Sequence, residues 1–254
     1  MVTVKHRRGL TVLMTILIVL SGLGWWWHSR WQVLNHVRVP QTHTATLFLP
    51  GNSGAWLSMR SMVLSLDRPH LASFPLTARV SQAGQVTWQQ HHAVTTNPLI
   101  PVIFKDNTHA LRQSRQLITV LDQLHGRYGI THVNFVGHSS GGTIAYDYLN
   151  HRPQAPVTVS RLVCIGADFP ERQPLKYHYP QLHILNLAGE IEAVGNDSEV
   201  PANTVTPLRH LVAGRVGSYR YEEVRGPIWQ TQHSLLHENP QLDVKVIRFL
   251  YPPS

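Results

Sequence analysis

One five-residue motif constrains the fold of this chain more than any other feature: Gly-His-Ser-Ser-Gly at residues 137–141. A strand-like run precedes it at residues 131–136, and small residues typical of a helix start follow it at residues 142–145. In that context G-x-S-x-G predicts a tight strand-to-helix turn, because glycine leaves room where any Cβ would clash. The turn exposes the hydroxyl of Ser139, and the helix offers N–H groups to developing negative charge. The motif therefore predicts a nucleophilic serine.

The rest of the chain alternates strand-like and helix-like segments from about Thr44 onward, which predicts an α/β fold with a mostly parallel sheet flanked by helices. Strands are expected at residues 44–49, 76–80, 86–88, 99–104, 131–136, 157–165 and 183–187. Helices are expected at residues 56–66, 107–128 and 244–250. A further helix is expected directly after the serine motif. Pro101 predicts that its strand is a sheet edge or a strand start. The short, Pro-rich segment 168–181 leaves room only for a minimal lid.

The first 31 residues are of a different kind. Three basic residues precede an uncharged apolar stretch, residues 9–27, which is close to the roughly 20 residues that cross a bilayer as a helix. A cluster of tryptophans at residues 25–31 resembles an interfacial aromatic anchor, and the basic flank predicts a cytoplasmic N-terminus. We expect residues 1–31 to form a cytoplasmic tip and transmembrane anchor, 32–43 a linker, and 44–254 an extracellular catalytic domain. A cleaved signal peptide and a secreted domain are the alternative.

Charge and cysteine content narrow the range of partners. The net charge is +8, and residues 1–121 hold eleven Lys and Arg but only two acids, whereas residues 122–254 hold eleven Lys and Arg and twelve acids. The basic residues are scattered and do not alternate with aromatic residues, so no nucleic-acid partner is expected. The excess of Lys and Arg over acidic residues is typical of a surface that faces an anionic cell envelope. Cys164 is the only cysteine and lies in an apolar run, which predicts a buried, inert thiol.

A serine nucleophile needs a histidine base and a carboxylate that orients it, and in this type of fold the chain order is serine, acid, histidine. The histidine is expected in a loop before the last helix. There His233 fits better than His237, because it comes first and follows a polar loop. The two histidines could form a metal pair if the segment were helical. No third ligand stands at a suggestive spacing, so neither a metal nor an organic cofactor is expected.

Three acids compete for the third position. Asp197 lies in an Asn-Asp-Ser turn, where backbone N–H groups can hold a short carboxylate, and it is favoured over Glu192. Glu192 has the Gly-x-x-acid spacing after the 183–187 strand, and Asp168 follows the preceding strand. Glu190 and Glu199 are expected to face solvent.

The developing oxyanion needs two N–H donors. One is expected from Ser140, which follows the nucleophile, and the other from the loop after the 44–49 strand. That loop reads Pro-Gly-Asn-Ser-Gly at residues 50–54. It replaces the His-Gly-x-x-Gly loop usual at this place, and the donor is the residue after its first glycine, Asn52.

Several segments, taken in order, resemble a group of poorly characterised α/β hydrolases described as cell-surface hydrolases of Gram-positive bacteria. The resemblance spans nearly all of residues 44–254 and is most distinctive in its last segment. It implies an α/β-hydrolase fold with a lipase- or esterase-like core and a triad of Ser139, Asp197 and His233. The segments are LFLPGNSG (47–54), the hairpin around residue 84, NPLIPVIF (97–104), VGHSSGG (136–142), NDSEVP (196–201) and HSLLHEN (233–239).

Three positions depart from the family pattern: Pro50 stands for the usual histidine, Ser140 for the usual methionine and Ser198 for the usual glycine. None of these changes removes a catalytic group. We therefore expect a membrane-anchored serine hydrolase that cleaves carboxylic esters or related acyl compounds, small or lipid-like. An acyltransferase with the same triad, or a non-catalytic surface binding module on the same fold, are the alternatives. The oligomeric state is left open.

Overall fold

The computed structural model of the chain describes residues 2–54, 57–151, 155–192 and 194–253. Within them, eight strands form one sheet in the order β3-β2-β4-β1-β5-β6-β7-β8. The β2–β3 pair is antiparallel and the other neighbouring pairs are parallel. The strands are β1 (Ala45–Leu49), β2 (Leu76–Val80), β3 (Val86–Gln90), β4 (Leu99–Phe104), β5 (His132–His138), β6 (Thr158–Ile165), β7 (Tyr179–Ile191) and β8 (Val216–Gly226). The predicted α/β fold with a mostly parallel sheet is confirmed.

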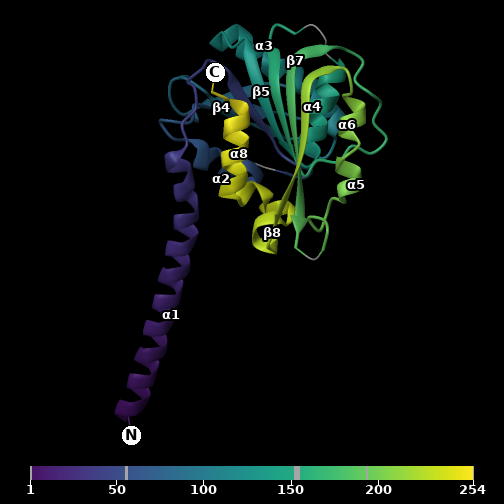
Figure 1. Cartoon of the computed structure of the whole chain (residues 1–254). Helices are drawn as coiled ribbons and strands as arrows, with labels where there is room; N and C mark the ends of the chain where they lie inside the picture. The colour runs from purple at the N-terminus through teal and green to yellow at the C-terminus, as the bar shows by residue number, and fades with distance from the viewer. Residues whose placement is uncertain (1, 55–56, 152–154, 193, 254) are drawn as a thin grey trace.

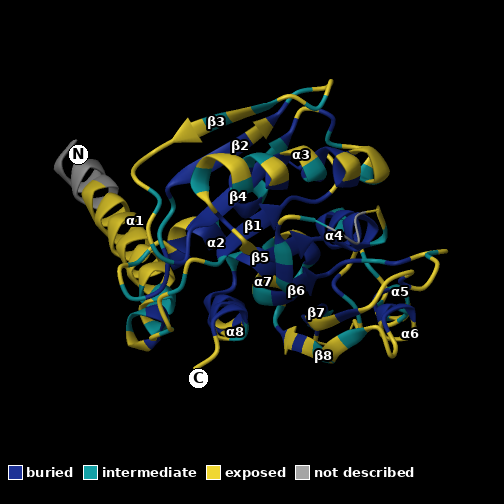
Figure 2. Ribbon diagram, turned by 90° about the horizontal axis from the view of Figure 1, so that it is seen from above, coloured by how far each residue is buried: buried dark blue, intermediate teal, exposed yellow. Residues whose placement is uncertain are grey.

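Helices cover both faces of the sheet (Figure 2). On one face lie α3 (Ala110–Tyr128) and α4 (Ser140–His151), and on the other α2 (Leu57–Leu66) and α8 (Pro240–Leu250). The remaining helical segments are α1 (Val2–Arg30), the 3-10 turn η1 (Trp31–His36), α5 (Ala202–Val205), α6 (Leu208–Leu211), α7 (Ile228–Thr231) and the 3-10 turn η2 (His233–Glu238). Residues 166–178, where a lid was expected to be minimal, form an irregular loop.

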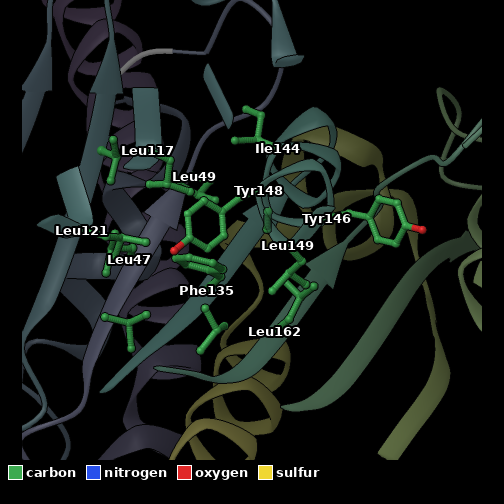
Figure 3. Close-up of a cluster of buried hydrophobic side chains, with 14 of the residues drawn as sticks. Leu47, Leu49, Leu117, Leu121, Phe135, Ile144, Tyr146, Tyr148, Leu149 and Leu162 are labelled. Carbon is green, nitrogen blue, oxygen red and sulfur yellow. The ribbon is translucent and has the colours of Figure 1, made fainter. Parts of the chain in front are cut away.

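The central strands are buried on both faces, as parallel strands between two helical layers must be. In β1 successive side chains alternate between the layers: Leu47 and Leu49 pack toward α3 and α4, and Phe48 packs toward α2 and α8. Figure 3 shows the first of these clusters, where Leu117 and Leu121 lie near Leu47. Burying one such side chain contributes about 1.5–3 kcal/mol. This double burial fixes the central strands firmly.

The N-terminal helix α1 projects from the domain as a single long rod (Figure 1). Its apolar side chains from Leu10 onward are exposed, and the segment Leu10–His36 is long and apolar enough to cross a membrane. Near its end the guanidinium of Arg30 lies 5.3 and 4.8 Å from the ring centroids of Trp26 and Trp27. The N-terminal apolar helix expected from the sequence is therefore present.

The structure differs from the sequence prediction at several places. β4 is an internal strand in spite of Pro101, and its pairing with β2 begins only at Val102, after the residue that lacks an N–H. β8 was not predicted, because this edge strand is largely exposed and shows no apolar alternation. β7 runs well beyond the predicted 183–187 in both directions. The predicted helix 56–66 is described as α2 from Leu57 to Leu66, and Trp56 lies outside the described residues.

The segment between α1 and β1 packs against the domain. Leu34 and Val37 are buried in the cluster that contains α2 and α8. Beyond α8, the phenol oxygen of Tyr251 lies 2.7 Å from Oγ1 of Thr46 in β1, although 205 positions separate the two residues. Both ends of the domain are thus joined to the same central strands.

Candidate active site

Ser139 lies at the turn between β5 and α4, in a left-handed backbone conformation with a φ of 52°. Such a conformation costs a non-glycine residue about 1–3 kcal/mol and persists only where the surroundings enforce it. Here a Cβ on Gly137 would come within 2.3 Å of the backbone of Gly141, and a Cβ on Gly141 within 2.1 Å of the Leu49 carbonyl oxygen. The Ser139 N–H donates to Ile165 O at 2.9 Å. The two glycines let the turn close against β1.

Asp197 and His233 are in direct contact. His233 Nδ1 donates to Asp197 Oδ2 at 2.8 Å, and the His233 backbone N–H donates to Asp197 O at 2.9 Å. The other carboxylate oxygen accepts the N–H groups of Glu199 and Val200 at 3.0 and 2.6 Å. Burial alone would raise the pKa of Asp197, but the hydrogen bonds from His233 and the two N–H groups outweigh it and lower the pKa. The carboxylate is therefore held ionised and oriented.

Ser139 and His233 open onto one pocket of about 490 Å³ at the carboxyl ends of the strands. It brings together Ser139 from the β5–α4 turn, His233 from η2, and Asn52 from the loop after β1. The full lining is Gly51, Asn52, Gly54, Ser58, His138, Ser139, Glu199, His233, Ser234 and His237. The predicted nucleophile, the predicted base and the predicted oxyanion donor Asn52 thus share one cavity. Asp197 lies behind the base.

The two predicted oxyanion donors flank the serine. A Cβ on Gly51 would lie 3.0 Å from Ser139 Cβ, so the loop that carries Asn52 runs directly along the turn. Ser140 is the first residue of α4, where N–H groups have no partner within the helix. Among the described residues, neither the Asn52 nor the Ser140 N–H donates to a backbone carbonyl outside the regular elements.

The competing candidates are not paired with the serine pocket in the same way, although His237 also lines that pocket. Glu192 is exposed, and its backbone N–H donates to Gly226 O at the end of β8. Asp168 lies in the loop after β6, and its carbonyl accepts from Thr143 Oγ1. His237 is buried, with its ring centroid 4.9 Å from that of His138. Across the described part of the chain, no group of three or more His, Cys, Asp and Glu side chains is arranged to hold a metal ion.

His138 is a site residue that the sequence reasoning missed, although it stands directly before the serine. Its ring is buried, with its centroid 4.7 Å from that of His233, and Nε2–H donates to His233 O at 3.0 Å. Burial, and then repulsion by His237 and His233, lowers its pKa from 6.5 to about 3. His138 is therefore neutral at ordinary pH, and its hydrogen bond holds the backbone of the base His233.

Glu199 also lies closer to the chemistry than expected. Its side chain is about half exposed, yet it lines the pocket, and Oε2 lies 3.9 Å from His233 Nε2. Gln232 Nε2 donates to its other oxygen at 3.2 Å. Glu199 is exposed, as expected, but its carboxylate also lies near the base, which was not expected.

Comparison with known proteins agrees with this fold. A family described as "alpha/beta hydrolase of unknown function (DUF915)" matches residues 35–179 and 172–252. No curated protein matches the chain. A gene product of Listeria innocua has a similar structure at a TM-score of 0.71 and 24% identity, over 86% of this chain and 96% of that one. A proposed cell surface hydrolase of Lactobacillus plantarum follows at a TM-score of 0.64 and 19% identity, over 81% of this chain and 89% of that one.

Proposed function

Because the chain belongs to a family of α/β hydrolases of unknown function, we propose that it is a serine hydrolase that cleaves carboxylic esters or related acyl compounds. One observation supports this above all. An oriented Asp197–His233 pair opens onto the same pocket as a serine held in the strained turn between a strand and a helix. Acyl transfer through a covalent intermediate is the chemistry that this set of groups performs.

In the proposed mechanism, Ser139 Oγ attacks the carbonyl carbon of the ester while His233 Nε2 accepts the hydroxyl proton. Asp197 keeps the proton on Nδ1 and stabilises the imidazolium that forms. The tetrahedral oxyanion accepts the N–H groups of Asn52 and Ser140, each worth about 3 kcal/mol of transition-state stabilisation. His233 then passes its proton to the departing alcohol, and an acyl-enzyme remains on Ser139. Water, activated by the same histidine, releases the acid and restores the serine.

We also propose that α1 anchors the domain in a membrane, with the N-terminus in the cytoplasm and residues 44–254 outside. The exposed apolar surface of α1 and the tryptophans at its end support an anchor. The basic residues before it support the orientation. Release of the full chain into the medium without detergent would contradict anchoring.

The test of the chemistry uses the full chain in detergent, with a fluorophosphonate probe and p-nitrophenyl esters. The wild type should label and turn over, and Ser139→Ala should do neither. Ser234→Ala, which changes another serine of the same pocket, is the matched control and should label. Labelling that persists in Ser139→Ala would overturn the nucleophile assignment. A wild type that never labels would favour the binding module, and transfer of the acyl group to a dilute added alcohol in preference to water would favour an acyltransferase.

A further inference from the structure

Large apolar side chains are exposed where the last two strands of the sheet, β7 and its neighbour the edge strand β8, end. Val194, after β7, is 56% exposed, and Ile228 and Trp229, in α7 after β8, are 55% and 50% exposed. The two loops are neighbours, because Ile191 and Gly226 are partners in the β7–β8 register and the Glu192 N–H donates to Gly226 O. We call Val194, Ile228 and Trp229 the apolar edge. Exposed apolar residues gathered in this way mark a contact surface.

The apolar edge borders the candidate active site. The β7 loop continues from Val194 to Asp197 and Glu199, and the β8 loop continues from Trp229 to His233. Glu199 and His233 both line the pocket. Any surface that covers the apolar edge therefore lies at the pocket mouth.

The apolar edge also lies on the side toward which the anchor extends. In Figure 1 α1 runs downward from the domain, and the strand-end loops after β7 and β8 form the bottom of the domain. The carboxyl ends of the strands and the N-terminal end of α1 thus point the same way. Locally, burial raises the pKa of Glu238 in η2, but hydrogen bonds with His237 and Ser61, together with the charge of Arg30 at the end of α1, outweigh it and lower the pKa. The segment that carries His233 is close to the end of the anchor.

We propose that the apolar edge docks into the outer leaflet of the membrane that α1 spans, so that the pocket receives an acyl ester carried by that bilayer. This inference rests on the proposed hydrolase activity and on the proposed anchoring. Indole and branched aliphatic side chains favour the bilayer interface. Because α1 already holds the domain at the surface, even a weak second contact is made at a high effective concentration. Two attachments then fix the pocket mouth against the lipid headgroups.

The docking is tested on the full chain in phospholipid vesicles, with an environment-sensitive fluorophore on Ile228→Cys. Tyr177→Cys is the control, because Tyr177 is also exposed but precedes β7, at the opposite end of the sheet. Cys164 is buried, and burial raises the pKa of its thiol, so it does not compete for the label. We expect blue-shifted emission and quenching by spin-labelled lipid at 228 but not at 177. Equal quenching of both labels by aqueous iodide would overturn docking. Protection at 228 that depends on protein density would indicate a second copy instead.

A kinetic measurement tests the substrate class. The double variant Ile228→Ser/Trp229→Ser is compared with Tyr177→Ser on a long-chain ester carried in the same vesicles and on a short soluble ester. We expect the double variant to lose about fivefold or more on the vesicle ester, and less than about twofold on the soluble one, since less apolar surface enters the bilayer. Equal losses on both esters would mean that these residues only support the catalytic loops. A wild type inactive on both would refute the hydrolase, while the labels would still report docking.

Discussion

The two halves of the candidate site are built in different ways. Ser139 stands in the turn that follows the central strand β5. The backbone packs so closely around this turn that an added Cβ would lie 2.3 Å from a backbone atom at Gly137 and 2.1 Å from one at Gly141. Asp197 and His233 stand on loops beyond the last two strands, β7 and β8, and hydrogen bonds join them although 36 positions of sequence separate them. The serine half is thus specified by shape and the acid–histidine half by polar pairing. Substitution of the turn glycines in the first half should therefore damage stability, whereas substitution of the acid in the second half should damage the chemistry.

The acid–histidine half gives the largest expected effect. Asp197→Asn keeps the size of the side chain but no longer fixes the proton on His233 Nδ1, so kcat should fall by about 10⁴-fold. Glu192→Gln is the matched control and should stay close to wild type, since Glu192 is exposed. Hydrolysis of p-nitrophenyl esters measures both. A large loss in Glu192→Gln instead would move the acid to that position.

A substitution in the serine half should lower the stability of the fold. In Gly141→Ala the new methyl group would lie 2.1 Å from the Leu49 carbonyl oxygen, so β1 or the turn must shift, at a cost of about 3 kcal/mol or more. Thermal unfolding in detergent measures the loss. Gly126→Ala in α3 is the control, because its Cβ meets nothing within 4 Å, and it should stabilise the helix by up to about 1 kcal/mol. A Gly141→Ala protein as stable as wild type would show that shape does not specify this half.

His138 connects the halves and predicts a dependence on pH. Its pKa is about 3 in the folded protein against an ordinary 6.5, so acid favours the unfolded chain, which binds the proton. The stability from neutral His138 is complete above pH 6.5 and is lost as pH falls toward 3. From pH 7 to 5 the loss is about 2 kcal/mol. Asp197, whose lowered pKa acts only below 3.8, does not contribute in this range.

Thermal unfolding at pH 7 and pH 5, in wild type and His138→Gln, isolates this contribution. In the variant, the difference in the free energy of unfolding between pH 7 and pH 5 should be about 2 kcal/mol smaller than in the wild type. A variant that keeps the whole wild-type difference would assign the acid sensitivity to other groups.

The smallest effect concerns the oxyanion donors. If the backbone N–H of Asn52 acts and its exposed side chain does not, then Asn52→Ala should change kcat by less than about threefold, against the 10²–10³-fold that follows loss of a donor. Ester kinetics decide between these outcomes. A loss in the larger range would assign the role to the side-chain amide.

The same contrast explains what could be predicted from the sequence. The β5–α4 turn, the central strands and the amphipathic helices follow from local rules of glycine geometry and apolar periodicity, and each was expected. β8 could not be seen, because an exposed edge strand needs no apolar alternation. His138 and Glu199 were missed because their meaning arises only when β5, η2 and the β7 loop meet. Residues of the triad could be found from their places in the chain order, whereas the approach of His138 and Glu199 to the base could not.

The long-range joints of the domain set an order of events during synthesis. Leu34 and Val37 follow α1 directly, yet their burial involves α8, and Thr46 in the first strand bonds Tyr251. The earliest residues of the domain to leave the ribosome must therefore wait for about 200 more before their partners exist. Throughout this interval the proposed anchor would keep the unfinished chain at the membrane surface. The contacts that join the two ends of the domain can form only after residue 251 has left the ribosome.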